Sequence, residues 1–212
     1  METVHPEPHW PAELALLVCS GLYVLLPSRL AVGPKWLLPV LVVLPLIPLS
    51  ARRHRRPDDA RWIRYLCITL IAIITVANCT SVVLLINRLF FGAHVVGRPL
   101  IYSAASIWLT NVIVFGLWLW EMDRGGPSRR AGTDERLPDI GFPQMDNPKL
   151  APSDWRPRFL DYLYTSFANG TSFAPADAMP LTFQAKSLFA IEALVSFITI
   201  AVIAGEAVNI LR

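Results

Sequence analysis

The chain has 212 residues, of which 54% are hydrophobic and 17% are charged, and its formal net charge is +3. Soluble domains carry about 25% charged residues, so this composition excludes an ordinary soluble domain and favours a protein with several membrane helices. The small net charge gives no reason to expect a nucleic-acid partner. No recognisable nucleophile, Walker or metalloprotease motif occurs, so we expect no enzyme activity.

Three apolar runs fill residues 1–100, which we interpret as a first unit of three membrane helices. Runs of about 20 apolar residues have the length that crosses a bilayer. The second run is short and contains three prolines, which remove backbone donors and are expected to kink it. The runs cover residues 14–30, 36–50 and 62–86.

Cysteine and histidine give no sign of a metal site. The three cysteines lie inside apolar runs and none forms C-x-x-C, so we expect free thiols that pack as small hydrophobes rather than redox or metal ligands. The four histidines lie outside the apolar runs without metal-ligand spacing. We therefore expect no metal and no cofactor.

Residues 101–212 form the second predicted unit. A fourth span covers residues 101–120, and residues 123–154, rich in proline, glycine and charge, are expected to be an exposed linker. A helix over about 156–169 follows, which is too short to cross a bilayer. A final span covers residues 183–211.

A polar turn, residues 166–182, separates the short helix from the final span. Non-helical backbone at membrane depth must be buried in protein or line a water-filled cavity. The half-helix also points its negative C-terminal end at the turn, which suits a cation. The sequence therefore predicts an all-α integral membrane protein with about five transmembrane helices, plus a re-entrant half-helix and loop (residues 155–182) between the last two.

The turn reads SFANGTSFAPADAMPLT, and its residues fall without a gap in the register S-x-T-T-x-T-T-V-G-Y-G-D-x-x-P-x-T. The positions concerned are Ser166, Thr171, Ser172, Phe173, Ala174, Pro175, Ala176, Asp177, Pro180 and Thr182. The turn thus resembles the pore segment of potassium channels, and the following AKSLFAIEALVSF resembles the start of their inner helix. The resemblance covers about 101–211 without the linker. It implies a filter-like loop (residues 171–177), a monovalent cation as permeant ion and a homotetramer.

The filter-like loop departs from the channel pattern at its centre. Channel filters need glycines where this chain has Ala174 and Ala176, and Pro175 fixes its own φ angle. If the loop lines a pore, we expect selectivity to rest on the Thr171 and Ser172 hydroxyls and the Asp177 carboxylate, rather than on stacked carbonyl rings.

A second pattern, D-x-L-Y-x-S-F-x-x-G-x-[TS]-F-x-x-[SA]-D, runs through the same region. It is met by Asp161, Leu163, Tyr164, Ser166, Phe167, Gly170, Ser172, Phe173 and Asp177. The whole chain resembles the family that carries this pattern, bacterial multi-span membrane proteins known only as a domain of unknown function. The resemblance implies a multi-pass protein of the plasma (inner) membrane.

Several polar residues of the half-helix and final span are further candidates for the site. Glu192 and Glu206 are the acidic residues well inside an apolar span, and spacings of 4, 3 and 7 put them on one face with Ser196 and Thr199. Buried charges in a membrane usually face a bundle interior or water, so we expect this stripe to line an inner cavity. Two alternatives stay open: Glu192 pairs with a group such as Asn111, or Glu206 extends to the interface.

On the half-helix, we take Asp161, Ser166 and Asn169 as candidate pore-helix residues. Asp161 has an alternative role as a packing contact with the linker.

Three hypotheses follow for function. The first is a cation-permeable pore made by four copies in a lipid bilayer. The second is a non-conducting membrane protein that keeps the pore-module fold for assembly or partner binding. The third is an ion-coupled transporter that uses Glu192. The channel template places the loop outside the cell, whereas the distribution of Lys and Arg favours the opposite orientation.

Overall fold

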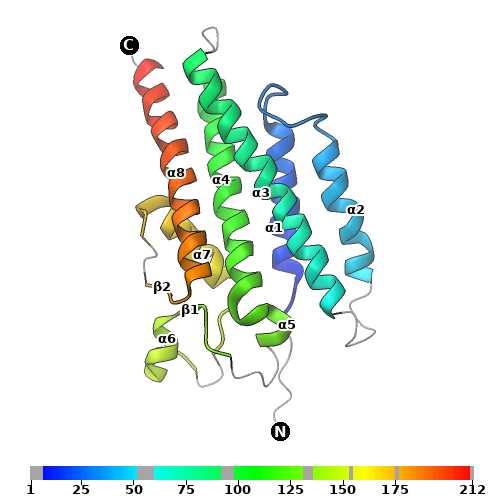
Figure 1. The fold of residues 1–212 in the computed structure, drawn as a ribbon, viewed down its shortest axis with the longest axis vertical. Helices are drawn as coiled ribbons and strands as arrows, with labels where there is room; N and C mark the ends of the chain where they lie inside the picture. The colour runs from blue at the N-terminus through cyan, green and yellow to red at the C-terminus, as the bar shows by residue number, and fades with distance from the viewer. Residues whose placement is uncertain are drawn as a thin grey trace.

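The computed structural model describes residues 7–51, 60–91, 98–130, 136–152, 155–174 and 177–210. This part of the chain is mostly helical, and its long helices run side by side in one bundle (Figure 1). The predicted all-α class is confirmed.

Among the described residues, three helices are long and apolar enough to cross a membrane. They are α3 (Ala60–Phe91), α4 (Arg98–Met122) and α8 (Phe183–Ile210). Two further apolar helices, α1 (Trp10–Leu25) and α2 (Leu37–Ala51), are shorter. Three of the five predicted spans therefore have the length of a membrane crossing.

Helix α4 lies at the centre of the bundle, with α1, α3 and α8 packed against it. Its apolar side chains Ile107, Leu117 and Leu119 are fully buried, as expected for a helix that is hydrophobic on every side and is surrounded by others. The core around it draws residues from both predicted units, such as Ile74 and Phe189.

The half-helix α7 (Phe159–Ser172) runs antiparallel to α4. At its start, the Phe159 ring packs edge-on against Trp120 with 5.9 Å between centroids. Near its end, Trp108 Nε1 donates to Gly170 O at 3.2 Å. Its 14 residues span about 21 Å at about 1.5 Å per residue. Helices α4 and α8 continue beyond it (Figure 1).

After α7 the chain returns to the end of the bundle from which α7 started. Strand β2 (Met179–Pro180) pairs antiparallel with β1 (Ile140–Gly141), and Ile140 lies opposite Pro180. Thr182 then caps α8, because its hydroxyl accepts a hydrogen bond from Ala185 N at 3.3 Å. We name the segment from the start of α7 to β2 the α7 hairpin. Both of its ends are thus held at one end of the bundle.

The connection between α4 and α7 contains short elements that gather at that end (Figure 1). They are η2 (Asp123–Gly125), α5 (Pro127–Arg130), α6 (Pro143–Asp146) and η3 (Pro148–Leu150).

The sequence predicted an exposed linker over residues 123–154, but the described part of this segment contains both exposed and buried residues. Leu137 is 88% exposed, but Asp123, Ile140 and Phe142 are buried because the segment folds back onto α4 and α7. The linker is therefore partly a packed element of the fold.

Candidate functional site

The first turn of α7 is anchored by Glu7, which precedes α1. Glu7 Oε1 accepts a hydrogen bond from Phe159 N at 2.7 Å. Its Oε2 accepts from Trp120 Nε1 at 3.0 Å and pairs with Arg130 at 3.4 Å. The first N–H groups of a helix lack internal partners and carry partial positive charge. A carboxylate at this point therefore stabilises the start of α7.

Asp161 also belongs to this helix start. Its Oδ2 accepts a hydrogen bond from Arg158 N at 2.7 Å, one turn before it. This is the reciprocal half of a capping box. The structure thus gives Asp161 a local contact with the residue that precedes α7, at the opposite end of the helix from the filter-like loop.

A second anchor surrounds Asp123, which is fully buried at the end of α4. Its Oδ2 accepts a hydrogen bond from the Tyr162 hydroxyl at 2.6 Å, and its Oδ1 accepts from Asp139 N at 2.8 Å. The Arg130 guanidinium lies 5.0 Å from the centre of the Tyr162 ring and donates to Asp123 O at 2.9 Å. Burial, opposed by the positive charge of Arg130, raises the pKa of Tyr162 well above its ordinary value.

Two glycines let α7 approach its neighbours closely. A Cβ on Gly116 of α4 would lie 3.0 Å from Leu163 Cα. A Cβ on Gly170 of α7 would lie 3.1 Å from Ser196 Oγ on α8 and 3.1 Å from Val112 on α4. Small residues at such crossings allow membrane helices to pack backbone against backbone.

Where α4, α7 and α8 meet, polar side chains form a buried group that we name the Glu192 cluster: Glu192, Ser166, Asn169, Asn111 and Ser196. Asn169 Nδ2 donates to Glu192 Oε2 at 2.9 Å, and Ser166 Oγ hydrogen-bonds with Glu192 Oε1. Asn111 Nδ2 donates to Glu192 O at 3.2 Å and to Ser196 Oγ at 3.0 Å. Asn111 thus meets the backbone of Glu192, while two residues of α7 meet its carboxyl group.

The predicted polar stripe of α8 is buried inside a single chain. Glu192, Ser196 and Thr199 are fully buried and Glu206 is 3% exposed. The Thr199 hydroxyl donates within its own helix, to Val195 O at 3.0 Å. A role of these side chains in lining a pore stays a prediction, and it requires α8 to turn or to separate from α4 and α7.

The filter-like loop, by contrast, is exposed where it is described. Thr171, Ser172, Ala174 and Asp177 are exposed. The Thr171 hydroxyl donates to Phe167 O at 2.7 Å and the Ser172 hydroxyl to Ala168 O at 2.6 Å. These bonds satisfy carbonyls of the last turn of α7. Pro175 and Ala176 lie outside the described residues.

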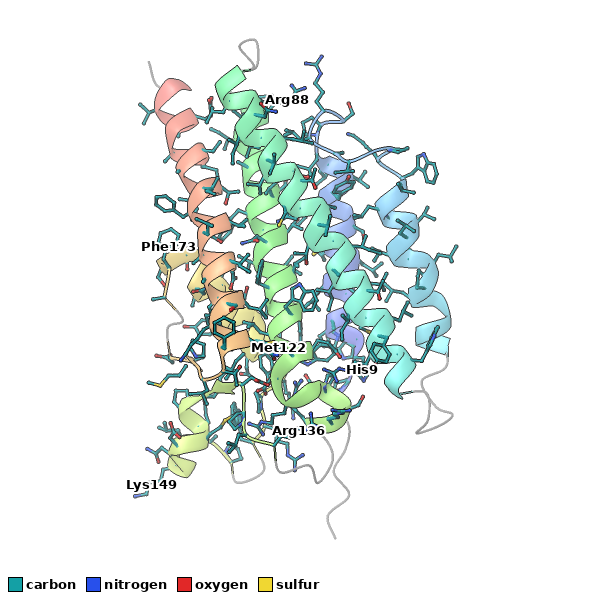
Figure 2. The ribbon with its side chains drawn as sticks, in the orientation of Figure 1. His9, Arg88, Met122, Arg136, Lys149 and Phe173 are labelled. Carbon is teal, nitrogen blue, oxygen red and sulfur yellow. The ribbon has the colours of Figure 1, made fainter. Side chains whose placement is uncertain are left out.

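Phe173 turns the chain at the end of α7. It has φ 57° and ψ 24°, a left-handed conformation that is uncommon for a residue other than glycine. Its ring packs against Phe197 with 5.7 Å between centroids. Phe197 lies in the middle of the apolar stretch Phe183–Val208. Figure 2 likewise shows Phe173 between the two ends of the bundle, with Arg88 towards one end and Arg136 towards the other.

Sequence reasoning missed the two anchors at the start of α7. Glu7, Asp123 and Arg130 were not singled out, because each lies in a polar stretch that reads as exposed. The only signal was the position of Asp123 three residues after an apolar run. Within the described part of the chain, no three His, Cys, Asp or Glu residues are grouped so that they could hold a metal ion.

The chain matches no protein-family model, and neither a similar curated protein nor a similar solved structure was found.

Proposed function

We propose that this protein crosses the membrane five times and forms a homo-oligomeric, cation-permeable pore around the filter-like loop. In this proposal α1 and α2 span the bilayer together with α3, α4 and α8. Helix α7 enters the membrane and its loop returns to the same side. The plasma membrane of a bacterium is the proposed location.

One observation carries this proposal: exposed non-helical backbone lies halfway along an apolar bundle. Phe173 and Ala174 follow α7 at the level of Phe197, and both are exposed. Irregular backbone at membrane depth must be covered by protein or must face water. Further copies of the chain around a water-filled axis satisfy this requirement at every copy.

The chemistry of the loop favours a cation. The negative end of the α7 dipole points at the loop, and the Asp177 carboxylate is exposed beyond it. Rings of carbonyls, hydroxyls and carboxylates select cations when several copies surround one axis. Closed rings are the usual geometry of homo-oligomers, and four copies are proposed by resemblance to potassium channels.

Exposed aromatic and aliphatic side chains accompany the loop on α7 and α8. Tyr164 and Phe167 on α7, and Leu194 and Phe197 on α8, are all exposed. In the proposed oligomer these side chains pack between copies or face lipid, while the loop faces the axis.

Cation flux into liposomes tests the proposal. The purified protein is reconstituted, and K⁺ and Na⁺ flux are compared with those of Asp177→Asn. The matched control is Asp146→Asn, because Asp146 lies in α6, outside the α7 hairpin. We expect flux in the wild type and the control, and a loss in Asp177→Asn. A folded, reconstituted wild type without flux contradicts the proposal.

The burial of the α8 stripe favours a second candidate, a non-conducting membrane protein that keeps the half-helix module for assembly. All four polar side chains of the stripe are buried inside one chain, so in this arrangement the stripe does not face a cavity shared between copies. This candidate predicts an oligomer that carries no cation under any condition. The oligomeric state and the flux, measured on one preparation, separate the two candidates.

A further inference from the structure

Each amide proton of Asn111 and Asn169 in the Glu192 cluster has an identified acceptor. Asn169 has two amide protons, and Nδ2 lies 3.0 Å from Phe189 O and 2.9 Å from Glu192 Oε2. The two amide protons of Asn111 go to Glu192 O and Ser196 Oγ. A backbone carbonyl only accepts hydrogen bonds. Each amide must therefore point its nitrogen, not its oxygen, at the carbonyl that it contacts.

Ser166 then presents one proton to two oxygens. Its Oγ lies 2.6 Å from Val112 O and also forms a hydrogen bond with Glu192 Oε1. Val112 O has no proton to give, so the Ser166 hydroxyl proton must occupy the contact with Val112 O. The contact between Ser166 Oγ and Glu192 Oε1 is then a hydrogen bond only if Glu192 supplies the proton.

We infer that Glu192 is a proton-binding site whose bound proton holds the C-terminal half of α7 against α8. The neutral acid donates to Ser166 and accepts from Asn169, three residues further along α7. Two hydrogen bonds from one side chain thus fix the part of α7 that leads into the filter-like loop.

In the part of the chain that the structure describes, the hydrogen-bond partners of Glu192 are neutral and do not balance a negative charge. Ser166 and Asn169 of α7 bond its carboxyl group, and Asn111 of α4 bonds its backbone carbonyl and Ser196 on the same helix; none of these is titratable. Among the described residues no Lys, Arg or His forms an ion pair with it.

Loss of the proton to water leaves a buried carboxylate. It can keep its contact with Ser166 only by drawing the hydroxyl proton away from Val112 O. A charge without a counter-charge is unfavourable in an apolar interior, so the ionised state favours separation of α7 from α8 and entry of water. The docked half-helix is thus the low-pH state, and the separated half-helix is the high-pH state.

This inference goes beyond the proposed pore, because it concerns one chain and holds whether or not the protein conducts. If the protein conducts, the same proton controls the half-helix that carries the filter-like loop. If it does not conduct, the position of α7 still depends on pH through this site. Failure of the flux experiment therefore leaves this inference intact. Failure of the experiments on Glu192 likewise leaves the proposed pore intact.

Infrared spectroscopy of the folded protein in lipid tests the inference directly. A protonated carboxylic acid has a C=O stretching band that a carboxylate lacks, and ¹³C-labelled glutamate shifts the band if it belongs to a Glu. We expect this band in the wild type at neutral pH, its loss in Glu192→Gln and its loss in the wild type as pH rises. The control Glu13→Gln, in the first turn of α1, keeps the band of Glu192.

Amide hydrogen exchange over residues 165–174 supplies the structural readout, after correction for the intrinsic rate at each pH. Glu192→Gln keeps an N–H donor for Ser166 and an oxygen for Asn169, so it matches the neutral acid. We expect exchange to rise with pH in the wild type and in Glu13→Gln, and to stay constant in Glu192→Gln.

Two results would overturn the inference. One is a labelled wild type without a glutamic-acid band at neutral pH, which needs no variant to fold. The other is the same rise of exchange with pH in the wild type and in Glu192→Gln.

Discussion

The hydroxyl of Tyr162 lies 2.6 Å from Oδ2 of Asp123, and this contact joins the first turns of α7 to the end of α4. Both side chains are fully buried. The same carboxylate accepts from the backbone of Asp139, directly before β1. One buried anion therefore fixes the entrance of α7 and the strand that holds its exit, so the position of the whole hairpin depends on it.

Replacement of Tyr162 by Phe should destabilise the protein markedly. It removes a hydrogen bond to a buried carboxylate, and hydrogen bonds to charged groups contribute about 1.5–3 kcal/mol. The matched control is Tyr164→Phe, because Tyr164 is on the same helix but 59% exposed. Thermal unfolding in detergent should show a clearly lower midpoint for Tyr162→Phe alone. Equal midpoints for the two variants would mean that the Asp123 contact contributes nothing to stability.

The same tyrosine should make stability depend on pH in the alkaline range. Burial raises the pKa of Tyr162 well above its ordinary value, which is about 10 in an unfolded chain. The folded state therefore keeps its proton where the unfolded state loses it. The stability from this group is complete below pH 10 and falls as pH rises further. Denaturant unfolding at several pH values should show a steeper alkaline loss in the wild type than in Tyr162→Phe.

Alanine at Gly170 should destabilise the meeting point of α4, α7 and α8. The new Cβ would lie 3.1 Å from Ser196 Oγ and from Val112, and overpacking of this kind costs about 1–3 kcal/mol. Gly21→Ala and Gly205→Ala are matched controls, because nothing lies within 4 Å of a Cβ at either site. Alanine is the better helix former by about 1 kcal/mol, so the controls should be unchanged or slightly more stable.

Loss of the Glu7 carboxylate should loosen the first turn of α7. Glu7→Ala leaves Phe159 N and Trp120 Nε1 without their acceptor and Arg130 without its ion pair. Amide exchange over residues 158–163 should rise several-fold, since an unmade buried hydrogen bond costs about 1–3 kcal/mol. Glu13→Ala, in the first turn of α1, is the control, and it should leave this segment unchanged. Unchanged exchange in Glu7→Ala would exclude this anchoring role.

The sequence was sufficient for the helical class, for the three long spans and for a half-length helix before the last one. Each follows from a local property: the length of an apolar run, or the length of the segment between the charged linker and the polar turn. The periodicity of Glu192, Ser196 and Thr199 showed that they share a face. It could not show whether that face meets another copy or, as here, α4 and α7 of the same chain.

The anchors at the start of α7 could not be predicted for a different reason. Asp123 and Glu7 lie in polar stretches, and the residues that they contact are 39 and 152 positions away in the sequence. Composition describes such stretches as exposed, because burial of an acid depends on donors that only the folded chain assembles. Proline, glycine and charge therefore predicted an exposed linker where part of the segment is packed.

Because the pairing of β1 with β2 holds the exit of the hairpin at the same end of the bundle as its entrance, the number of residues in α7 sets how deep its loop lies. Each helical turn added to or removed from α7 would move Phe173 by about 5.4 Å along the bundle. A turn inserted or removed before Ser166 would also carry Ser166 and Asn169 past Glu192, which contacts both. The stretch from Phe159 to Ser166 therefore sets both the depth of the loop and the register of the Glu192 contacts.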